Sequence, residues 1–351
     1  MNELNRLTLQ RPAWLEDGNN QNNVVLDTRV EISRNLEQYP FPHRASLLEK
    51  EQVYNSLSTA LASSKIIGES PLHLNLQKSS DIAVTLLFER ELIDFSLIQS
   101  SGDRGVILGD NGVTIAFNSH NHLMFFTSDH TKTTQEKWEL LDSLDTRLGK
   151  DLSYAYDAAQ GFLLSDIDSC GTGLSLSSTL HLPGLLLTNT LHQVLNGVAQ
   201  AGIMAEGKFK DGNDSWGSLF RVRSGAYSGD TEEEILEVHH ESLKEIELRE
   251  REARQKLFDE AHLEMEDKIW RSLGILQNCR LLSIPQLLNL TSALRLGIEE
   301  GVLDNKLSLA SLNSLIASSL QGSVALLTEE EVTQGSNLDK QRAEIIRTLL
   351  S

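Results

Sequence analysis

Two histidines separated by one residue, His120 and His122, are the first side chains whose spacing could do chemistry. Residues two apart on a β-strand share a face, so both imidazoles could bind one metal ion. No third ligand lies nearby in the sequence, and the polar end of an ordinary strand has the same pattern. Both interpretations stay open, and we expect no bound metal.

Other short motifs argue against common catalytic and metal sites. The glycine-rich segment Gly171-Thr172-Gly173 is not followed by a lysine, so it is not a Walker-type phosphate loop. A Ser-His-Asp triad carries no weight without a nucleophile elbow. The two cysteines, Cys170 and Cys279, lie far apart and have no CxxC or Cys/His zinc spacing. We therefore predict a reduced, cytoplasmic protein without structural disulfides.

The chain is strongly acidic, with a formal net charge of −19 over 351 residues. Such a charge argues against a broad basic surface for nucleic acid or anionic lipid, and ATP binding would need a local concentration of positive charge. Acidity of this size is also typical of a surface that only favours solubility. No apolar run approaches the roughly 18–20 residues that span a bilayer, and the N-terminus has no signal-peptide pattern. We expect no nucleic-acid or membrane partner.

The length predicts two domains, and the residue pattern changes along the chain. Residues 1–23 predict a short helix around Trp14 and a polar loop. From residue 24 to about 229, short strand-like runs at 113–117 and 123–127 occur together with helical windows at 135–148 and 181–202. This mixture predicts an α+β fold with a largely antiparallel sheet flanked by helices.

A capping-box pattern at Thr231 and Glu234 marks the start of a long helical segment. Apolar residues then recur close to helical spacing up to Ile269, among positions dense in Glu, Lys and Arg. This predicts one long helix, with or without a break, and short helices after it. The predicted domains are residues 1–23, an N-terminal helix and loop, residues 24–255, the α+β domain, and residues 256–351, a helical C-terminal domain.

Three groups of segments, in order along the chain, carry a family resemblance. Residues 24–36 follow the pattern V-L-S-[ST]-R-[IV]-R-x-x-R-N, residues 154–183 contain Gly171-Thr172-Gly173-Leu174 and His181-Leu182-Pro183, and residues 270–298 end in Leu294-Arg295-Leu296-Gly297-Ile298. From about Trp14 to Arg347 the chain resembles the bacterial protein-arginine kinases (McsB type) of the phosphagen, or guanidino, kinase family. The resemblance implies a guanidino-kinase-like sheet domain, followed by a helical domain for dimerisation and phosphoarginine binding.

Phosphoryl transfer to a guanidino group needs fixed cations around the triphosphate, and carboxylates that orient the acceptor and take up its proton. Arginine suits the first task because its planar fork bonds phosphate oxygens in pairs. The resemblance implies about five such arginines, two catalytic glutamates and a nearby cysteine.

Most of the implied site positions hold other residues here. Of the arginine positions only Arg29 is retained, and the other four hold Glu31, Met124, Ser175 and Glu206. The two glutamate positions hold His120 and Asp211, and the cysteine position holds Asp166. A like-charge contact near 4 Å costs about 4 kcal/mol at an effective dielectric near 20, so we predict no productive Mg-ATP binding. The acidic residues could instead hold a cation or a basic group, or they mark an abandoned site.

Asp339 and Arg342 match the family's C-terminal R-D-x-x-R-A motif, except that Leu338 replaces its first arginine. By resemblance, the aspartate would hold the guanidinium of a phosphoarginine and the arginine its phosphate. An Asp–Arg pair three residues apart on a helix is also a common structural ion pair. Ligand binding by Asp339 and Arg342 is one of these two open interpretations.

The preferred hypothesis is a pseudokinase that needs no cofactor and acts as a binding or regulatory protein. Its partners, by resemblance, are a zinc-binding activator of the McsA type, the Clp protease machinery or a second copy in a homodimer. The alternative is an active ATP-dependent protein-arginine kinase that binds Mg-ATP, with Asp211, Asp166 and His120 sharing the role of base. A third hypothesis is a phosphoarginine reader that uses Asp339 and Arg342.

Overall fold

The computed structural model describes residues 7, 10–16, 24–64, 67–209, 215–224, 230–303, 306–332 and 334–351. The chain forms two compact units that interleave along the sequence. The first contains residues 1–7, 28–177 and 223–239, and the second contains residues 8–27, 178–222 and 240–351. The predicted domain boundary after residue 255 falls within one helix, α8 (Glu232–Glu260), and the division into domains stays a prediction.

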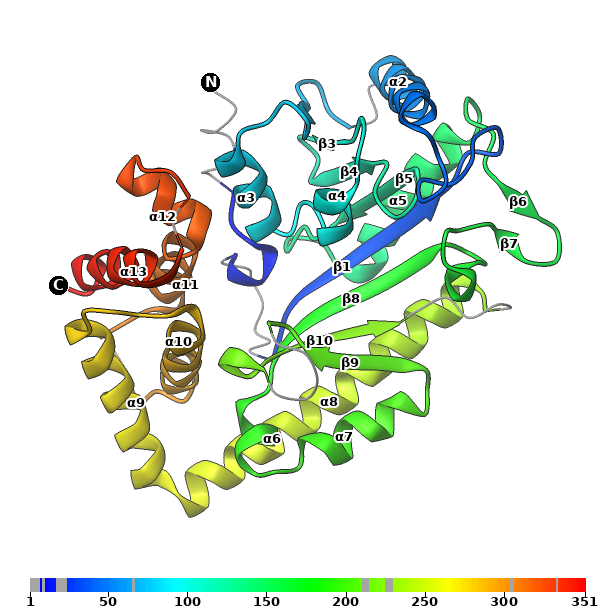
Figure 1. Cartoon of the computed structure of the whole chain (residues 1–351). Helices are drawn as coiled ribbons and strands as arrows, with labels where there is room; N and C mark the ends of the chain where they lie inside the picture. Colours follow the sequence, from blue (N-terminus) through cyan, green and yellow to red (C-terminus); the bar gives the residue numbers. More distant parts are fainter. Residues whose placement is uncertain are drawn as a thin grey trace. The chain divides into compact units, whose positions relative to one another are not determined.

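An eight-stranded sheet runs in the order β2-β3-β4-β5-β1-β8-β10-β9. Its strands are β1 (Val25–Arg34), β2 (Leu72–Asn75), β3 (Gly105–Leu108), β4 (Val113–Phe117), β5 (Leu123–Thr127), β8 (Leu174–His181), β9 (Ile203–Gly207) and β10 (Leu219–Ser224). A separate hairpin joins β6 (Tyr156–Asp157) to β7 (Gly161–Phe162). Strands β2 to β5 pair antiparallel in sequence order, and β5 pairs antiparallel with β1. In Figure 1 the long strands β1, in blue, and β8, in green, lie side by side. The predicted antiparallel sheet is confirmed.

Helices flank the sheet and make up the C-terminal region. They are η1 (Ala13–Leu15), α2 (Leu47–Ser64), α3 (Asp81–Glu89), α4 (Phe95–Gln99), α5 (Thr134–Leu148), η2 (Ile167–Ser169), α6 (Pro183–Leu187), α7 (Leu191–Ala199), η3 (Trp216–Ser218), α8, α9 (His262–Asn278), α10 (Ile284–Glu299), α11 (Leu309–Ser318), α12 (Gln321–Thr328) and α13 (Gly335–Leu349), where η marks a 3-10 helix. The predicted run 135–148 is α5, and the predicted helical C-terminal region is confirmed.

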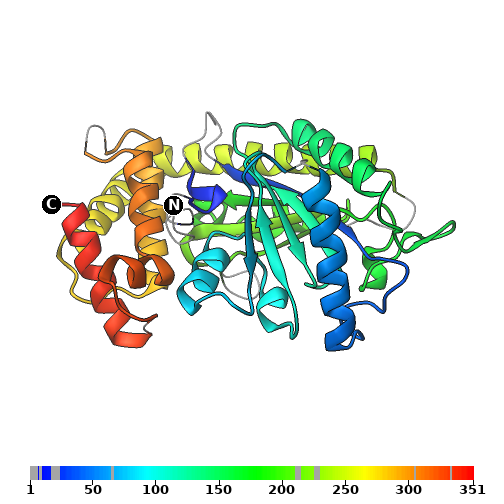
Figure 2. The same cartoon turned by 90° about the horizontal axis from the view of Figure 1, so that it is seen from above.

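The core of the first unit lies between the sheet and two helices. Val30 and Ile32 of β1 are buried together with residues of α2 and α5, among them Leu57 and Leu141. In Figure 2, α2 is the blue helix that runs along the strands of this unit. Because successive side chains of a strand point to opposite faces, the residues of β1 next to Val30 and Ile32 face away from this core.

The second unit has two apolar clusters. One packs the ends of β8, β9 and β10 against α6, α7 and α8, through residues such as Leu180, Val222 and Ile246. Figure 1 shows these three helices beside β9 and β10. The other cluster holds α9, α10, α11 and α13 together around residues such as Leu294 and Leu312. No single helix among the described residues is long and apolar enough to cross a membrane, and one bent pair, α11 with α12, passes by length and composition.

Three local predictions change in the structure. The predicted helical window 181–202 is split into α6 and α7, because Asn189 between them has a left-handed backbone (φ 57°). The predicted helix around Trp14 is the short 3-10 helix η1, and the polar loop after it lies outside the described residues. His120 and His122 lie in the bend between β4 and β5 rather than on a strand.

The long helical segment after Thr231 forms two helices, α8 and α9, with a break at Ala261. Thr231 Oγ1 accepts a hydrogen bond from the Glu234 amide (3.2 Å), and the Glu234 carboxylate accepts one from the Thr231 amide (2.8 Å). The reciprocal bonds confirm the predicted capping box.

A buried ion network ties α8 to its neighbours in the second unit. Glu250 accepts two backbone N–H bonds at the start of α6, each 2.8 Å long, and a bond of 2.6 Å from Arg254 Nε. Arg254 also donates from Nη1 to Glu299 (2.7 Å) and from Nη2 to the carbonyl of His181 (3.0 Å). The side chains of Arg254, Glu250 and Glu299 are 5%, 0% and 1% exposed. The network therefore joins β8, α6, α8 and α10 out of contact with water.

We expect Arg254→Met to lower the free energy of unfolding by about 3–5 kcal/mol, because it leaves the buried Glu250 without its cation and Glu299 with only Arg295, 4.0 Å away. Burial raises the pKa of Glu299 to about 7, so urea unfolding should be measured at pH 8, where this carboxylate is charged. Arg249→Met is the matched control. Arg249 pairs with Glu245 on the exposed face of the same helix, and its loss should leave the urea midpoint nearly unchanged. Equal effects of the two substitutions would show that burial of the network does not matter.

Candidate functional site

The retained arginine, Arg29, is already bound by groups of its own unit. Its Nη2 donates to Glu31 Oε2 at 2.6 Å, and its Nη1 donates to the carbonyl of Glu91 at 3.1 Å. The guanidinium also lies over the ring of Phe126, 3.3 Å from its centroid. Glu31, at a position where the family resemblance implies arginine, thus neutralises the charge of Arg29.

Arg29 and Glu31 share one face of the sheet with two other substituted positions of the first unit. Met124 lies on β5 between the core residues Leu123 and Phe125, and Ser175 lies on β8 between the core residues Leu174 and Leu176. By alternation, both point away from that core, as Arg29 and Glu31 do. The register confirms the neighbourhood, because Glu31 lies opposite Phe126 and Ser33 lies opposite Met124. The structure therefore brings Arg29, Glu31, Met124 and Ser175 to one face, where Arg29 is the one cation among these four positions.

The two histidines of the β4–β5 bend have different surroundings. His122 is fully buried, and its Nδ1 accepts from the Leu36 amide (3.0 Å), while its Nε2 lies 3.0 Å from the carbonyl of Pro40 and donates to it. Burial lowers the pKa of His122 to about 4, so the ring is neutral at pH 7. His120 is exposed, and its backbone carbonyl accepts from Ser165 Oγ (2.7 Å).

These contacts bear on the metal interpretation. Both ring nitrogens of His122 are taken by backbone groups, which leaves His120 without a second histidine ligand. Across the described segments, no three His, Cys, Asp or Glu side chains gather in a way that could hold a metal ion. The pair therefore has the contacts of a structural bend.

The other acidic positions have surroundings of their own. Asp166 is exposed and caps η2, where its carboxylate accepts from the Asp168 amide (3.4 Å). Glu206 is exposed on β9, on the strand face opposite the core residue Ile203. Asp211 lies outside the described residues.

Arg34 holds the glycine-rich segment in place, a role that the sequence pattern did not predict. Its Nη1 donates to the carbonyls of Ser33 and Thr172 (both 2.8 Å), and its Nη2 pairs with Asp145 at 2.5 Å. Gly173 has a positive φ of 69°, and a Cβ there would overlap Arg34 Nη1 and the Ser33 carbonyl. The glycine-rich segment is thus held by packing against Arg34. Only the position of Arg34 in the 24–36 pattern could have pointed to this role. Its ion-pair partner Asp145 is 111 residues away, so no local spacing links the two residues.

The C-terminal pair is also integrated into the fold. Arg342 Nη1 donates to Asp339 (2.8 Å) and to the carbonyl of Leu282 (2.7 Å), while its Nε donates to the carbonyl of Ser319 (2.8 Å). Its side chain is 3% exposed, whereas that of Asp339 is 30% exposed. In this structure Arg342 joins α13 to the segments before α10 and after α11, as a structural ion pair does. Phosphate binding by Arg342 would require these bonds to open.

Known families match nearly the whole chain in two parts. Residues 52–253 match the family described as ATP:guanido phosphotransferase, C-terminal catalytic domain. Residues 262–351 match the family described as protein-arginine kinase McsB C-terminal domain.

Individual relatives agree with these matches. The chain is 30% identical to the protein-arginine kinase of Moorella thermoacetica over 98% of this chain and 99% of that protein. It is 32% identical to the protein-arginine kinase of Desulforamulus reducens over 83% of this chain and 82% of that protein. A solved lombricine kinase resembles the fold with a TM-score of 0.57 at 15% identity, over 69% of this chain and 71% of that one. The substrate-free duplicated taurocyamine kinase from Schistosoma mansoni does so with a TM-score of 0.58 at 16% identity, over 75% of this chain and 41% of that one.

The buried His122 predicts a pH dependence of stability. Its pKa falls from 6.5 to about 4 on folding, so between these values the unfolded chain binds the extra proton. Stability from this group is present above pH 6.5 and is lost as the pH falls toward 4, by up to about 3 kcal/mol. His122→Gln should therefore flatten the dependence of the unfolding free energy on pH in this window, measured by urea titration.

The exposed histidine of the same bend provides the control. His120→Gln should keep the slope of the unchanged protein, because its ring is in water in both states. The same slope in His122→Gln and in the unchanged protein would contradict the assignment.

Proposed function

The chain belongs to the ATP:guanido phosphotransferase family and, within it, to the protein-arginine kinases, and from this premise we propose that it is a pseudokinase. It keeps the scaffold of the family, does not bind Mg-ATP productively, and acts as a binding or regulatory protein. The observation that carries the proposal is the 2.6 Å ion pair between Arg29 and Glu31.

The ion pair opposes nucleotide binding in two ways. A phosphate that used Arg29 would have to compete with the Glu31 carboxylate, the Glu91 carbonyl and the Phe126 ring for the same guanidinium. It would also approach Glu31, and a like-charge contact near 4 Å costs about 4 kcal/mol at an effective dielectric near 20. The retained arginine therefore supports the fold instead of a phosphate.

Met124 and Ser175, the other two of these four positions, offer no replacement charge. Met124 is buried and has no hydrogen-bond donor, and the Ser175 hydroxyl donates one bond where arginine offers a charged fork. Preorganised cations are the main contribution of a protein to phosphoryl transfer. These four positions therefore supply no unpaired cation for the developing charge of the transferred group.

Calorimetry with Mg-ATP tests the proposal. We expect no binding up to about 1 mM in the unchanged protein, since its one cation at these four positions is paired. The double variant Glu31→Arg/Ser175→Arg should bind at least about tenfold more tightly than the unchanged protein, because it restores two charged forks. Glu31→Asp/Ser175→Gln, which keeps the carboxylate at position 31 and adds no charge at position 175, is the matched control and should stay close to the unchanged protein. Micromolar binding by the unchanged protein would overturn the proposal.

The alternative of an active protein-arginine kinase has a separate readout. It requires ATP-dependent, acid-labile phosphoarginine on an arginine-rich protein substrate, with Asp211, Asp166 and His120 sharing the role of base. Asp166 caps η2 and His120 is exposed, so we expect no phosphoarginine by mass spectrometry. Phosphoarginine that disappears in Asp211→Ala would establish the alternative.

A regulatory protein needs a partner, and the family suggests which to test first. We include in the proposal a zinc-binding activator of the McsA type, the Clp protease machinery or a second copy of this chain. The tagged chain is co-purified with each candidate, with and without ATP. Partner binding that is independent of ATP indicates a pseudokinase scaffold, whereas partner binding that changes with ATP indicates a nucleotide-binding kinase. The pseudokinase hypothesis requires the same partner binding with and without ATP.

A further inference from the structure

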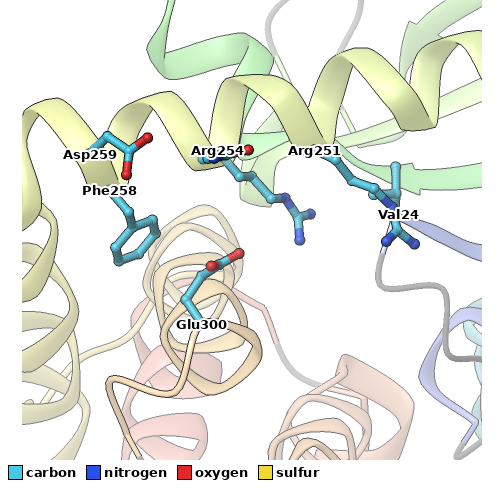
Figure 3. A pocket seen from close by; sticks show the side chains of 7 residues that line it. Val24, Arg251, Arg254, Phe258, Asp259 and Glu300 are labelled. Atoms are coloured by element: carbon cyan, nitrogen blue, oxygen red, sulfur yellow. The ribbon is translucent and has the colours of Figure 1, made fainter.

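The pocket between α8 and the end of α10 does not select a ligand by charge. It measures about 390 Å³, and Arg251, Arg254, Asp259 and Glu300 all line it. Figure 3 shows Arg254 projecting from α8 toward Glu300. Both charge signs are therefore present on one wall. A chemical step that the chain can carry out by itself is found elsewhere, in a turn of the first unit.

The sequence has two Asn-Gly pairs, and their backbones differ. Asn111-Gly112 lies in the turn between β3 and β4, whereas Asn196-Gly197 lies inside α7. Gly112 is exposed and Asn111 is half-buried, and both residues of the helical pair are exposed. Because the two pairs have the same covalent structure, a difference in their reactivity reports on the fold around them.

The β3–β4 turn folds the Asn111 side chain back over its own backbone. Its Oδ1 accepts a hydrogen bond from the amide of Val113 (3.3 Å), two residues further along the chain. A Cβ placed on Gly109 would lie 2.7 Å from the same Oδ1, so the carboxamide reaches across the turn. An asparagine that bonds the backbone in this way forms a turn of its own. The carboxamide of Asn111 therefore lies alongside the amide between the two bonded groups, that of Gly112.

The Gly112 amide is weakly held. It donates to the carbonyl of Gly109 at 3.4 Å, which is long for a hydrogen bond. Gly112 has a φ of 80° and no side chain that would block the approach of Asn111. Inside α7, by contrast, amides such as that of Gly197 are directed along the helix axis toward the preceding turn. The helix must open locally before this amide can reach the Asn196 side chain.

We propose that Asn111 is a site of spontaneous deamidation. The Gly112 nitrogen forms a bond to Cγ of Asn111, the Cγ–Nδ2 bond breaks, and the amide proton leaves with Nδ2 as ammonia. Water then opens the five-membered succinimide at either carbonyl carbon, which leaves aspartate or isoaspartate at position 111. Water is the only co-reactant, and no group is oxidised or reduced. The proposal does not rest on whether the chain is a pseudokinase.

Deamidation changes this end of the sheet in two ways. Both products add a negative charge to the turn that already contains Asp110, and Gly112 lies against Asp129, since a Cβ there would be 3.4 Å from its Oδ2. Like charges at such short range repel. Isoaspartate also lengthens the backbone by one methylene, which disturbs the 2.8 Å bond from the Gly109 amide to the Val113 carbonyl. The modified chain therefore has a less stable β3–β4 turn.

Peptide mapping by mass spectrometry of the full chain, incubated at pH 8, tests the site. We expect the folded protein to convert Asn111 at least about tenfold faster than Asn196, because α7 must open first. In urea both pairs lose their native backbone, and their rates should come within about twofold of each other. Gly112→Ala should slow conversion at position 111 and leave position 196 unchanged, and Gly197→Ala is the matched control with the opposite effect.

Thermal unfolding first establishes that each variant is folded. Equal rates at the two sites in the folded protein would overturn the proposal. So would an Asn111 that stays intact in the folded protein over the time in which both sites convert in urea. A preference for Asn111 that persists undiminished in urea would assign the difference to neighbouring residues instead of the turn, and would also contradict it.

Discussion

The alternation of side chains along β1, β5 and β8 is the constraint on which the rest of the structure depends. Val30, Ile32 and Leu176 point into the core of the first unit, so the residues between them point away from it. A shift of one residue in any of these strands would move the whole apolar set into water. The core therefore determines the register of the strands, but it does not restrict the residue types on the opposite face. Glu31 and Ser175, at positions where the family resemblance implies arginine, are compatible with that register.

The contacts of Arg29 lie within its own unit. Two neighbouring arginines on one strand face repel each other until an anion binds between them. With glutamate at position 31, Arg29 has a partner at 2.6 Å and a ring beneath it. This arrangement is complete without a ligand. Sites kept for catalysis commonly store such unfavourable contacts, and relieving them stabilises a fold at the expense of activity.

Sequence patterns predicted the parts of the fold that depend on neighbours along the chain. Strands β4 and β5, helix α5 and the Thr231–Glu234 capping box all have local signals. The same reasoning placed His120 and His122 on a strand, because their spacing does not reveal that a bend lies there. It could not show that His122 is bound by Leu36 and Pro40, more than 80 residues earlier. The wrong prediction for His120 and His122 thus concerns a bend whose conformation depends on contacts distant in sequence.

The candidate site was predictable as a set of positions, through the family resemblance, but its contacts were not. The residue types at Met124, Ser175 and Glu206 are visible in the sequence. Whether Arg29 is available to a ligand depends on Glu91 and Phe126, which are 62 and 97 residues away. Arg342 likewise has an acid three residues away that suggests a binding pair, yet its other partners are the carbonyls of Leu282 and Ser319. A short spacing between an acid and an arginine therefore does not predict ligand binding. The other hydrogen-bond partners of the arginine must also be known.

Four arginines of this chain share a structural role. Arg29, Arg34, Arg254 and Arg342 each bond carboxylates and backbone carbonyls inside their own unit. Their positive charge is therefore neutralised within the fold, whereas acids such as Asp259 and Glu300 are exposed at the surface. A net charge of −19 therefore has a spatial meaning, because the potential that a ligand meets is more negative than the count of arginines suggests. At long range, such a surface attracts cations more than anions.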